Sequence, residues 1–266
     1  MILEEIVAAK KRELKRAKEE RPPAELRSKA RSAAPLRDFG RALRREGEVS
    51  IIAEIKRASP VRGLLRESLD PASLARQYAE GGARAISVLT DREFFRGSVE
   101  DLRAARLAVE LPVLRKDFVL DEYQLWESRV MLADAALLIV RLLERTQLRE
   151  YLALAREELR LATLVEVHTE RELERALDAQ APIVGINNRD LESFRVTLET
   201  TARLRPLVPA ETTVVSESGI ASAADLALLR HLGVHAALIG EELVRAADPA
   251  AKLRELHGGT GNPGRG

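Results

Sequence analysis

The sequence predicts a (β/α)8 barrel with an extra N-terminal helical segment. Eight short apolar runs begin at residue 49, and they cover residues 49–56, 84–89, 112–118, 135–140, 162–168, 182–187, 212–217 and 235–240. Strands that alternate with helices indicate βαβ units and a parallel sheet, and eight units close a barrel. A doubly wound open sheet, the main alternative, usually carries a G-x-G-x-x-G fingerprint after its first strand. The corresponding loop here reads RASPVRG.

Charged segments with helical character separate these runs. We expect helices at residues 70–82, 98–110, 145–159, 169–180 and 222–233. Each lies between two apolar runs, where a crossover helix is required to connect parallel strands.

A helical extension is expected over residues 1–47, before the barrel. Residues 2–20 carry one apolar stripe at helical spacing, formed by Ile2, Leu3, Ile6, Val7 and Leu14. Pro22 and Pro23 end this helix, and a second short amphipathic helix is expected over 36–47. The sequence leaves open whether the first helix covers the barrel mouth or its side. The barrel domain is expected over 48–257, and the glycine-rich residues 258–266 as a disordered tail.

Composition limits the class of protein. The 266 residues are 45% hydrophobic, and 43 basic against 42 acidic side chains give a net charge of +1. This balance argues against a nucleic-acid partner. The absence of cysteine excludes disulfides and thiolate metal sites, and no apolar stretch is long enough for a membrane span. We therefore expect a cytoplasmic protein. Two methionines and three asparagines are compatible with a thermophilic source, although a GC-rich genome would explain much of this depletion.

Polar residues at the predicted strand ends form the main functional signal. In a (β/α)8 barrel the active site lies at the carboxyl ends of the strands. In this chain those ends carry Glu54, Lys56, Lys116, Phe118, Glu166, His168, Asn187, Glu217, Ser218, Gly219 and Gly240. Clusters of opposed charges at one rim are typical of acid–base chemistry. The alternative is a structural ion network that plugs the barrel.

The two lysines are unusual in this arginine-rich chain. Between residues 30 and 251 the only lysines are Lys56 and Lys116. An ammonium is compact and can give up a proton, whereas a guanidinium stays charged and presents a planar fork. Each lysine alone could still be a strand residue whose ammonium reaches solvent.

The few asparagines and histidines indicate which kinds of polar site the chain can form. Asn187 and Asn188 are the only asparagines apart from Asn262, which indicates a directed hydrogen-bonding need, although Asn188 could equally be a turn residue with positive φ. His168 is read first as a structural or rim residue and second as a catalyst. No second histidine stands at metal-ligand spacing, so no metal site is expected.

A phosphate site is expected after the last strands. Barrels frequently bind phosphate with the loops that follow strands 7 and 8. Backbone N–H groups at Ser218 and Gly219, and at Gly240 and Glu241, are the candidates, and Arg189 could add a guanidinium.

These motifs are similar to those of the indole-3-glycerol phosphate synthase family. The resemblance runs from about residue 2 to residue 257 and rests chiefly on AEIKRASP (53–60), PVLRKDF (112–118), LVEVH (164–168), GINNRDL (185–191) and VSESGI (215–220). It implies a carboxy-lyase of tryptophan biosynthesis that works without a cofactor on a phosphorylated small molecule. The implied reaction turns 1-(2-carboxyphenylamino)-1-deoxyribulose 5-phosphate into indole-3-glycerol phosphate. We expect a monomer or a weak homodimer.

The resemblance also assigns roles to residues. It implies that Lys116 is the general acid and Glu166 the base of the dehydration, and that Lys56 holds the substrate carboxylate and shares acid duties. It implies orienting roles for Glu54 and Asn187 and a supporting or substrate-contacting carboxylate at Glu217. The implied phosphate residues are Lys56, Arg189, Ser218, Gly219, Gly240 and Glu241, and the implied pocket for the aromatic ring is Phe95, Phe118, Leu137, Leu191, Phe194 and Ile239.

Two positions depart from the family pattern, and two alternative functions are less consistent with the sequence. Val61 and Arg62 stand where many members have Ser and Lys, which leaves the detail of loop closure open but not the chemistry. Leu132 replaces a common glycine, which we interpret as a packing change. A phosphoribosylanthranilate isomerase would be expected to carry an early catalytic cysteine, and the chain has none. A catalytically silent barrel would be expected to lack the charged rim residues that are present here.

Overall fold

The chain folds into a closed barrel of eight parallel strands, which confirms the predicted fold class. The computed structural model describes residues 2–190 and 195–258. The strands lie in the order β1-β10-β9-β8-β7-β6-β5-β4 around the barrel. They are β1 (Ser50–Ile55), β4 (Ala85–Leu89), β5 (Val113–Lys116), β6 (Ala135–Ile139), β7 (Ala162–Val167), β8 (Ile183–Asn187), β9 (Thr213–Glu217) and β10 (Ala236–Ile239). A small hairpin of β2 (Ala58–Ser59) and β3 (Gly63–Leu64), which the sequence analysis did not anticipate, follows β1.

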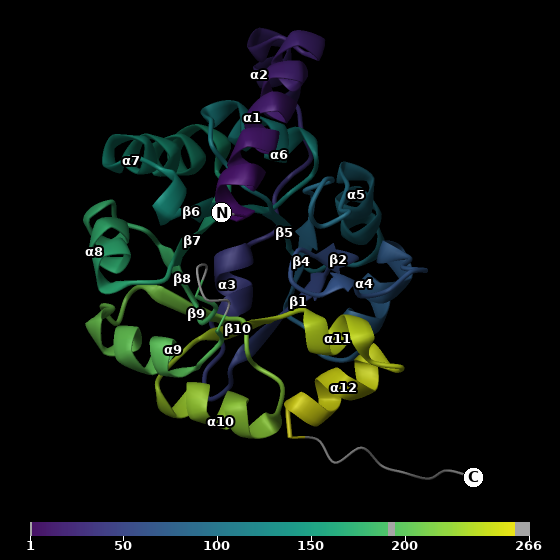
Figure 1. Cartoon of the computed structure of the whole chain (residues 1–266), viewed down its shortest axis with the longest axis vertical. Helices are drawn as coiled ribbons and strands as arrows, with labels where there is room; N and C mark the ends of the chain where they lie inside the picture. Colours follow the sequence, from purple (N-terminus) through teal and green to yellow (C-terminus); the bar gives the residue numbers. More distant parts are fainter. Residues whose placement is uncertain (1, 191–194, 259–266) are drawn as a thin grey trace.

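Helices surround the barrel (Figure 1). They are α1 (Ile2–Glu20), α2 (Pro23–Arg31), α3 (Phe39–Leu43), α4 (Pro71–Glu80), α5 (Val99–Ala108), α6 (Glu122–Val130), α7 (Arg145–Ala153), α8 (Glu170–Asp178), α9 (Glu199–Leu204), α10 (Ala223–His231), α11 (Glu241–Arg245) and α12 (Pro249–Leu256). Short 3-10 helices η1 (Val140–Leu142) and η3 (Arg205–Leu207) and the π-helix η2 (Leu154–Leu159) complete the set.

Side-chain caps explain where several crossover helices begin. Asp70, Ser98, Thr169 and Ser222 each accept a hydrogen bond from a backbone N–H in the first turn of α4, α5, α8 and α10. Such a cap satisfies one of the amide groups that have no partner inside the helix. The cap residues lie within one residue of the predicted helix starts.

Two apolar layers form the core. Alternate strand residues point into the barrel, where Ile52, Leu114, Leu164 and Val215 are fully buried against one another. The intervening residues pack outward against the helices in a larger cluster. This period-two alternation follows from strand geometry.

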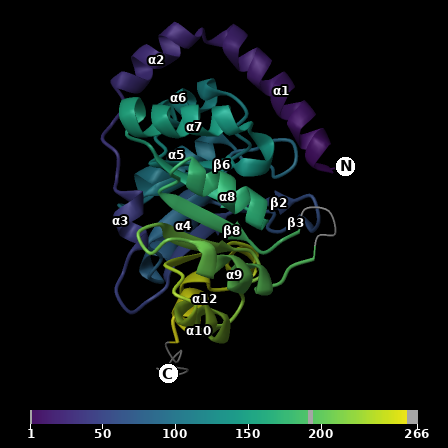
Figure 2. The ribbon, with the colours of Figure 1, turned by 90° about the vertical axis from the view of Figure 1, so that its left-hand side faces the viewer.

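Residues 2–47 of the N-terminal extension contain three helices rather than the expected two. The unexpected α2 begins at Pro23, at the first helical turn, where proline is tolerated because its missing N–H needs no partner. The predicted helix over 36–47 is shorter in the structure, where α3 spans only Phe39–Leu43. Phe39 and Leu43 pack with the inward-facing strand residues and close the end of the barrel where the strands begin. The start of α1 and the β2–β3 hairpin lie on the opposite side (Figure 2).

A buried lysine fastens α1 to the barrel. Lys10 is 2% exposed, and its Nζ lies 2.8 Å from Asp117 and 3.2 Å from Asp91, in the segments after β5 and β4. Burial alone would lower the pKa of Lys10, but the carboxylates of Asp117, Glu13 and Asp91 raise it well above its ordinary value. The ammonium is therefore charged at neutral pH, and it holds the helix over this rim.

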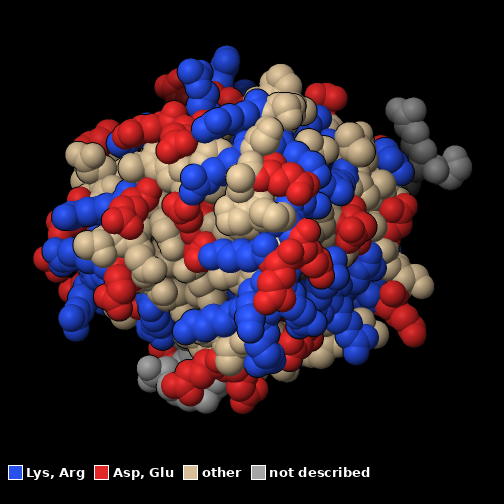
Figure 3. Space-filling model, turned by 90° about the horizontal axis from the view of Figure 1, so that it is seen from above, with Lys and Arg blue, Asp and Glu red and all other residues tan. Residues whose placement is uncertain are grey.

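The surface carries charges of both signs. Basic and acidic side chains intermingle over the face shown in Figure 3, as the near-zero net charge predicts. Across the described ranges no helix is both long and apolar enough to cross a membrane. The predicted tail falls mainly on residues 259–266, which lie outside the described residues.

Leu132 has a backbone conformation that favours glycine, and our interpretation of its presence as a packing change stays a prediction. Its φ is +73°, in the left-handed region that an L-residue occupies at a cost. It follows α6 and leads into β6, a position where glycine would fit without strain.

We therefore expect Leu132→Gly to raise the free energy of unfolding by about 1 kcal/mol, because it relieves the left-handed strain. Urea denaturation of the purified protein measures the change. The matched control is Leu228→Gly in the middle of α10, which should lower stability by about 1 kcal/mol or more. A loss of stability in Leu132→Gly would show that its side-chain contacts outweigh the strain.

Candidate active site

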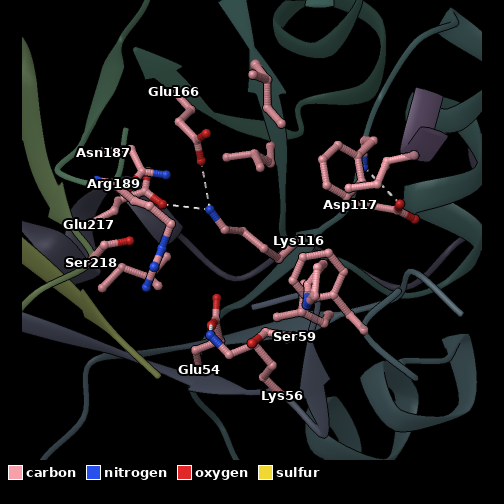
Figure 4. Close-up of a pocket in the computed structure, with 18 of the residues that line it drawn as sticks. Glu54, Lys56, Ser59, Lys116, Asp117, Glu166, Asn187, Arg189, Glu217 and Ser218 are labelled. Atoms are coloured by element: carbon pink, nitrogen blue, oxygen red, sulfur yellow. Dashed lines mark hydrogen bonds and ion pairs between the residues drawn. The ribbon is translucent and has the colours of Figure 1, made fainter. Parts of the chain in front are cut away.

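A pocket opens at the carboxyl ends of the strands, on the side that α1 partly covers. Both lysines singled out from the sequence line it (Figure 4). Its polar lining includes Glu54, Lys56, Lys116, Glu166, Asn187, Arg189, Glu217, Ser218 and Glu241, and its apolar lining includes Ile2, Leu3, Ile6, Val61, Leu89, Phe95, Phe118, Leu137, Ile139 and Leu238.

Lys116 lies between two carboxylates. Its Nζ is 2.9 Å from Glu166 Oε2 and 2.6 Å from Glu217 Oε2, and its side chain is only 13% exposed. The three residues come from β5, β7 and β9, so barrel closure brings them together. Burial alone would lower the pKa of Lys116, but the two carboxylates raise it well above its ordinary value. Lys116 is therefore an ammonium at neutral pH.

The two carboxylates beside Lys116 differ in their affinity for protons. Burial raises the pKa of Glu217 to about 7, and its Oε1 is buried without a hydrogen-bond partner in the described part of the chain. For Glu166 the burial effect is outweighed by Lys116 and His168, and its pKa lies below the ordinary value. Glu166 is therefore ready to accept a proton, and Glu217 can hold one near neutral pH.

Glycines let the carboxylates approach the neighbouring backbone. A Cβ atom at Gly185 would lie 2.2 Å from Glu217 Oε1, and one at Gly240 would lie 2.5 Å from Glu54 Oε1. A side chain at either position would therefore displace the carboxylate beside it. Gly240 was predicted as a phosphate contact, but it is not among the residues that line the pocket, and what the structure shows is the room it gives to Glu54.

Lys56 and Glu54 form a second ion pair at the same rim. Lys56 Nζ lies 2.8 Å from Glu54 Oε1, and both side chains line the pocket. The two lysines therefore face one cavity. Their convergence at the carboxyl end of the barrel is what the sequence analysis required.

The expected phosphate residues occupy one side of the pocket. Arg189 and Ser218 lie near each other in Figure 4, and both line the pocket, as does Glu241. Ser218 and Gly219 both have positive φ, at +68° and +79°. Gly219 is not a lining residue; its missing side chain leaves room for Val196, which would lie 2.5 Å from a Cβ there. The Glu241 carboxylate is 3.3 Å from both Arg62 and Arg245.

Asn187 and Asn188 have different surroundings. Asn187 lines the pocket, and its Oδ1 accepts a hydrogen bond from the Arg189 backbone N–H at 3.0 Å. Asn188 is buried, donates from Nδ2 to Ser216 and accepts at Oδ1 from Thr201. It is not among the residues with positive φ, so its interpretation as a left-handed turn residue was wrong. Asn188 instead ties β8 to β9 and α9.

The apolar wall agrees with the predicted ring pocket only in part. Phe95, Phe118 and Leu137 line the pocket, and the Phe95 and Phe118 ring centroids are 6.0 Å apart. Ile239 instead packs in the layer between strands and helices, and its neighbour Leu238 faces the cavity, because successive strand residues point to opposite sides. The predicted Leu191 and Phe194 lie outside the described residues.

Helix α1 contributes to this wall, which was not predicted from the sequence. Ile2, Leu3 and Ile6 line the pocket, and all three belong to the apolar stripe that predicted the helix. The apolar stripe indicated that this face of α1 is buried, but the sequence pattern does not identify the residues it packs against. The question of where the first helix packs is thus answered, since it lies at the barrel mouth.

No group of three potential metal ligands occurs among residues 2–190 and 195–258. The chemistry of the pocket is described by its own ammonium, carboxylate and amide groups. Together they offer a buried proton donor, a buried proton acceptor and a cationic side for an anion, next to an apolar wall.

Comparison with known proteins identifies the family. The family model described as "Indole-3-glycerol phosphate synthase" matches residues 3–256. A protein of that name from Polaromonas sp. is 49% identical over 260 residues, covering 97% of this chain and 98% of its own length. One from Roseiflexus sp. is 49% identical over 267 residues, covering 97% and 99%.

A more distant solved structure shares the fold alone. The thiamine phosphate pyrophosphorylase from Pyrococcus furiosus superposes with a TM-score of 0.61 at 17% identity, covering 83% of this chain and 96% of that chain. The barrel, the paired lysines at its mouth and the match along nearly the whole chain lead to one conclusion: this protein belongs to the indole-3-glycerol phosphate synthase family.

Proposed function

We propose that this protein converts 1-(2-carboxyphenylamino)-1-deoxyribulose 5-phosphate into indole-3-glycerol phosphate, carbon dioxide and water. The observation that carries the proposal is the Lys116 ammonium, held between Glu166 and Glu217 in a pocket with an apolar wall. The reaction closes a ring onto a carbonyl carbon, and that step needs a proton donor in a site that limits access of water.

Ring closure is assigned to Lys116. As the aromatic carbon that bears the carboxylate attacks the substrate carbonyl carbon, the new C–C bond pushes an electron pair onto the carbonyl oxygen. Lys116 donates a proton to that oxygen, which becomes a hydroxyl group on the substrate. The ammonium has Glu166 and Glu217 as hydrogen-bond partners, and both carboxylates stabilise it in position before the transfer.

Decarboxylation and dehydration follow. Loss of carbon dioxide returns the electron pair of the broken C–C bond to the ring. The hydroxyl group then departs as water after protonation by an ammonium, and Glu166 accepts the proton that the new ring loses. The low pKa of Glu166 keeps it available as a base, and Glu217, with its pKa of about 7, can hold a proton between steps.

The remaining pocket residues orient the substrate. Lys56 holds the substrate carboxylate and shares acid duties with Lys116, while Glu54 and Asn187 fix the polar groups around it. Lys56, Arg189, Ser218 and Glu241 line the side of the pocket that we assign to the phosphate, and Phe95, Phe118 and Leu137 line the wall for the aromatic ring. The cytoplasmic location and the monomeric or weakly dimeric state stay predictions.

Lys116→Met is expected to lower kcat by a factor of about 100 to 10,000, because it removes the general acid while keeping the bulk of the side chain. Steady-state kinetics with the purified substrate measures the change. Lys18→Met is the matched control, since this partly exposed lysine pairs with Asp121 away from the pocket. Turnover in Lys116→Met close to that of the control would refute the acid role.

Arg189→Ala is expected to raise KM about tenfold or more with a smaller change in kcat, because it removes a cation from the assigned phosphate side. Arg203→Ala, which breaks an exposed pair with Glu170, serves as the control and should leave both constants unchanged. An unaltered KM in Arg189→Ala would mean that other groups bind the phosphate.

Lys56→Arg is expected to lower kcat/KM by at least about tenfold despite the retained charge. The planar guanidinium is larger than the ammonium, and its geometry differs from that of the point charge paired with Glu54. Lys252→Arg at an exposed helix pair is the control. Full activity in Lys56→Arg would show that any cation serves at this position.

A further inference from the structure

His168 occupies an unusual place behind the proposed base. It follows the last residue of β7, and its side chain is only 5% exposed. The imidazole lies between two carboxylates, with Nδ1 3.1 Å from Glu172 Oε2 and Nε2 3.4 Å from Glu166 Oε1. The sequence left open whether this residue is structural or catalytic, and the geometry connects it directly to Glu166.

The Glu172 side fixes the orientation of the ring. Glu172 Oε2 also accepts the His168 backbone N–H at 2.7 Å, and Glu172 Oε1 pairs with Arg141 Nε at 3.0 Å. With Nδ1 held by Glu172, the buried Nε2 is left without a hydrogen bond among the described residues, and it faces the carboxylate of the base. A carboxylate at Nδ1 in this way fixes the direction in which the ring presents Nε2.

Charges alternate along this line of side chains. The N···O distances between successive members are 2.9 to 3.4 Å, in the order Arg141, Glu172, His168, Glu166 and Lys116. Burial would lower the pKa of His168, but Glu172 and Glu166 raise it above its ordinary value. His168 and Arg141 help to lower the pKa of Glu172 to about 2. An imidazolium therefore fits between the two carboxylates.

We propose that His168 is a positioning residue for Glu166: its imidazolium holds Oε1 while Lys116 holds Oε2, so that the carboxylate stays ionised and aimed at the substrate. This inference rests on the proposed function, in which Glu166 accepts the proton lost during dehydration. His168 itself need not touch the substrate.

Loss of the His168 imidazolium should change the pH dependence of kcat in a defined direction. Glu166 faces two cations, Lys116 and His168, together with Glu217 and the amide of Asn187. Loss of the imidazolium removes one of the two cations, so the pKa of Glu166 should rise. A base with a higher pKa becomes protonated at a higher pH. The acid limb of the kcat profile should therefore move to higher pH.

The test is the kcat–pH profile of the full-length protein, with the wild type beside His168→Gln and Glu172→Gln. We expect the acid limb to move up by about one pH unit in His168→Gln and in the same direction in Glu172→Gln, which removes the carboxylate that orients and charges the ring. His235→Gln is the matched control, because His235 precedes β10 at the opposite end of the barrel and accepts from the Val214 N–H. Its profile should coincide with that of the wild type.

The outcomes separate the two proposals. A wild-type protein that forms no indole product would overturn the proposed function, whereas an active wild type whose acid limb is unchanged in His168→Gln would overturn only the role of His168. If His168→Gln does not fold, Glu172→Gln carries the same test. Nitrogen NMR of the wild-type imidazoles adds a readout that needs no substrate. The pKa of His168 should lie above the ordinary value of histidine, and a pKa below that value would also overturn the proposal.

Discussion

The buried ammonium of Lys116 is the constraint that shapes the rest of the site. A charge removed from water is tolerated only when it is paired and hydrogen-bonded. Glu166 and Glu217 supply that pairing at 2.9 Å and 2.6 Å, but two carboxylates beside one ammonium leave an excess of negative charge. Burial, together with the Glu166 and Glu54 carboxylates, raises the pKa of Glu217 to about 7, although Lys116 acts in the opposite direction. Glu217 can therefore hold a proton near neutral pH, which reduces the negative charge around Lys116.

The backbone around Lys116 is fixed from both sides of the barrel wall. Arg115, the preceding residue, points into the helix layer and pairs with Asp117 and Glu127, while Asp117 also pairs with Lys10 of α1. Because successive strand residues point to opposite sides, an outward ion network can hold the inward side chain of Lys116 in place. The N-terminal helix is therefore part of the frame of the site as well as part of its apolar wall.

The sequence predicted the strands and helices that depend on local patterns, but it did not predict contacts between residues far apart in the chain. Eight apolar runs predicted eight strands, and the charged segments between them predicted crossover helices, because both signals lie within a few neighbouring residues. The rim residues followed from barrel topology. Ile239 was misplaced by one residue, which reverses the side that a strand residue faces. The Lys10 pairs join segments about eighty and a hundred residues apart in the chain, and no local pattern marks such partners. Family membership then sets aside the isomerase alternative.

The two sides of the pocket determine which way a substrate can lie. Arg189 and Ser218 line one side, and Phe95, Phe118 and Ile6 contribute an apolar wall. A molecule with a phosphate at one end and an aromatic ring at the other matches this division in one orientation, because the reverse would place a charge against apolar side chains. In the proposed reaction this orientation leads the atoms between ring and phosphate past Lys56 and Lys116. The polarity of the cavity would then account for the approach of the reacting carbons to Lys116.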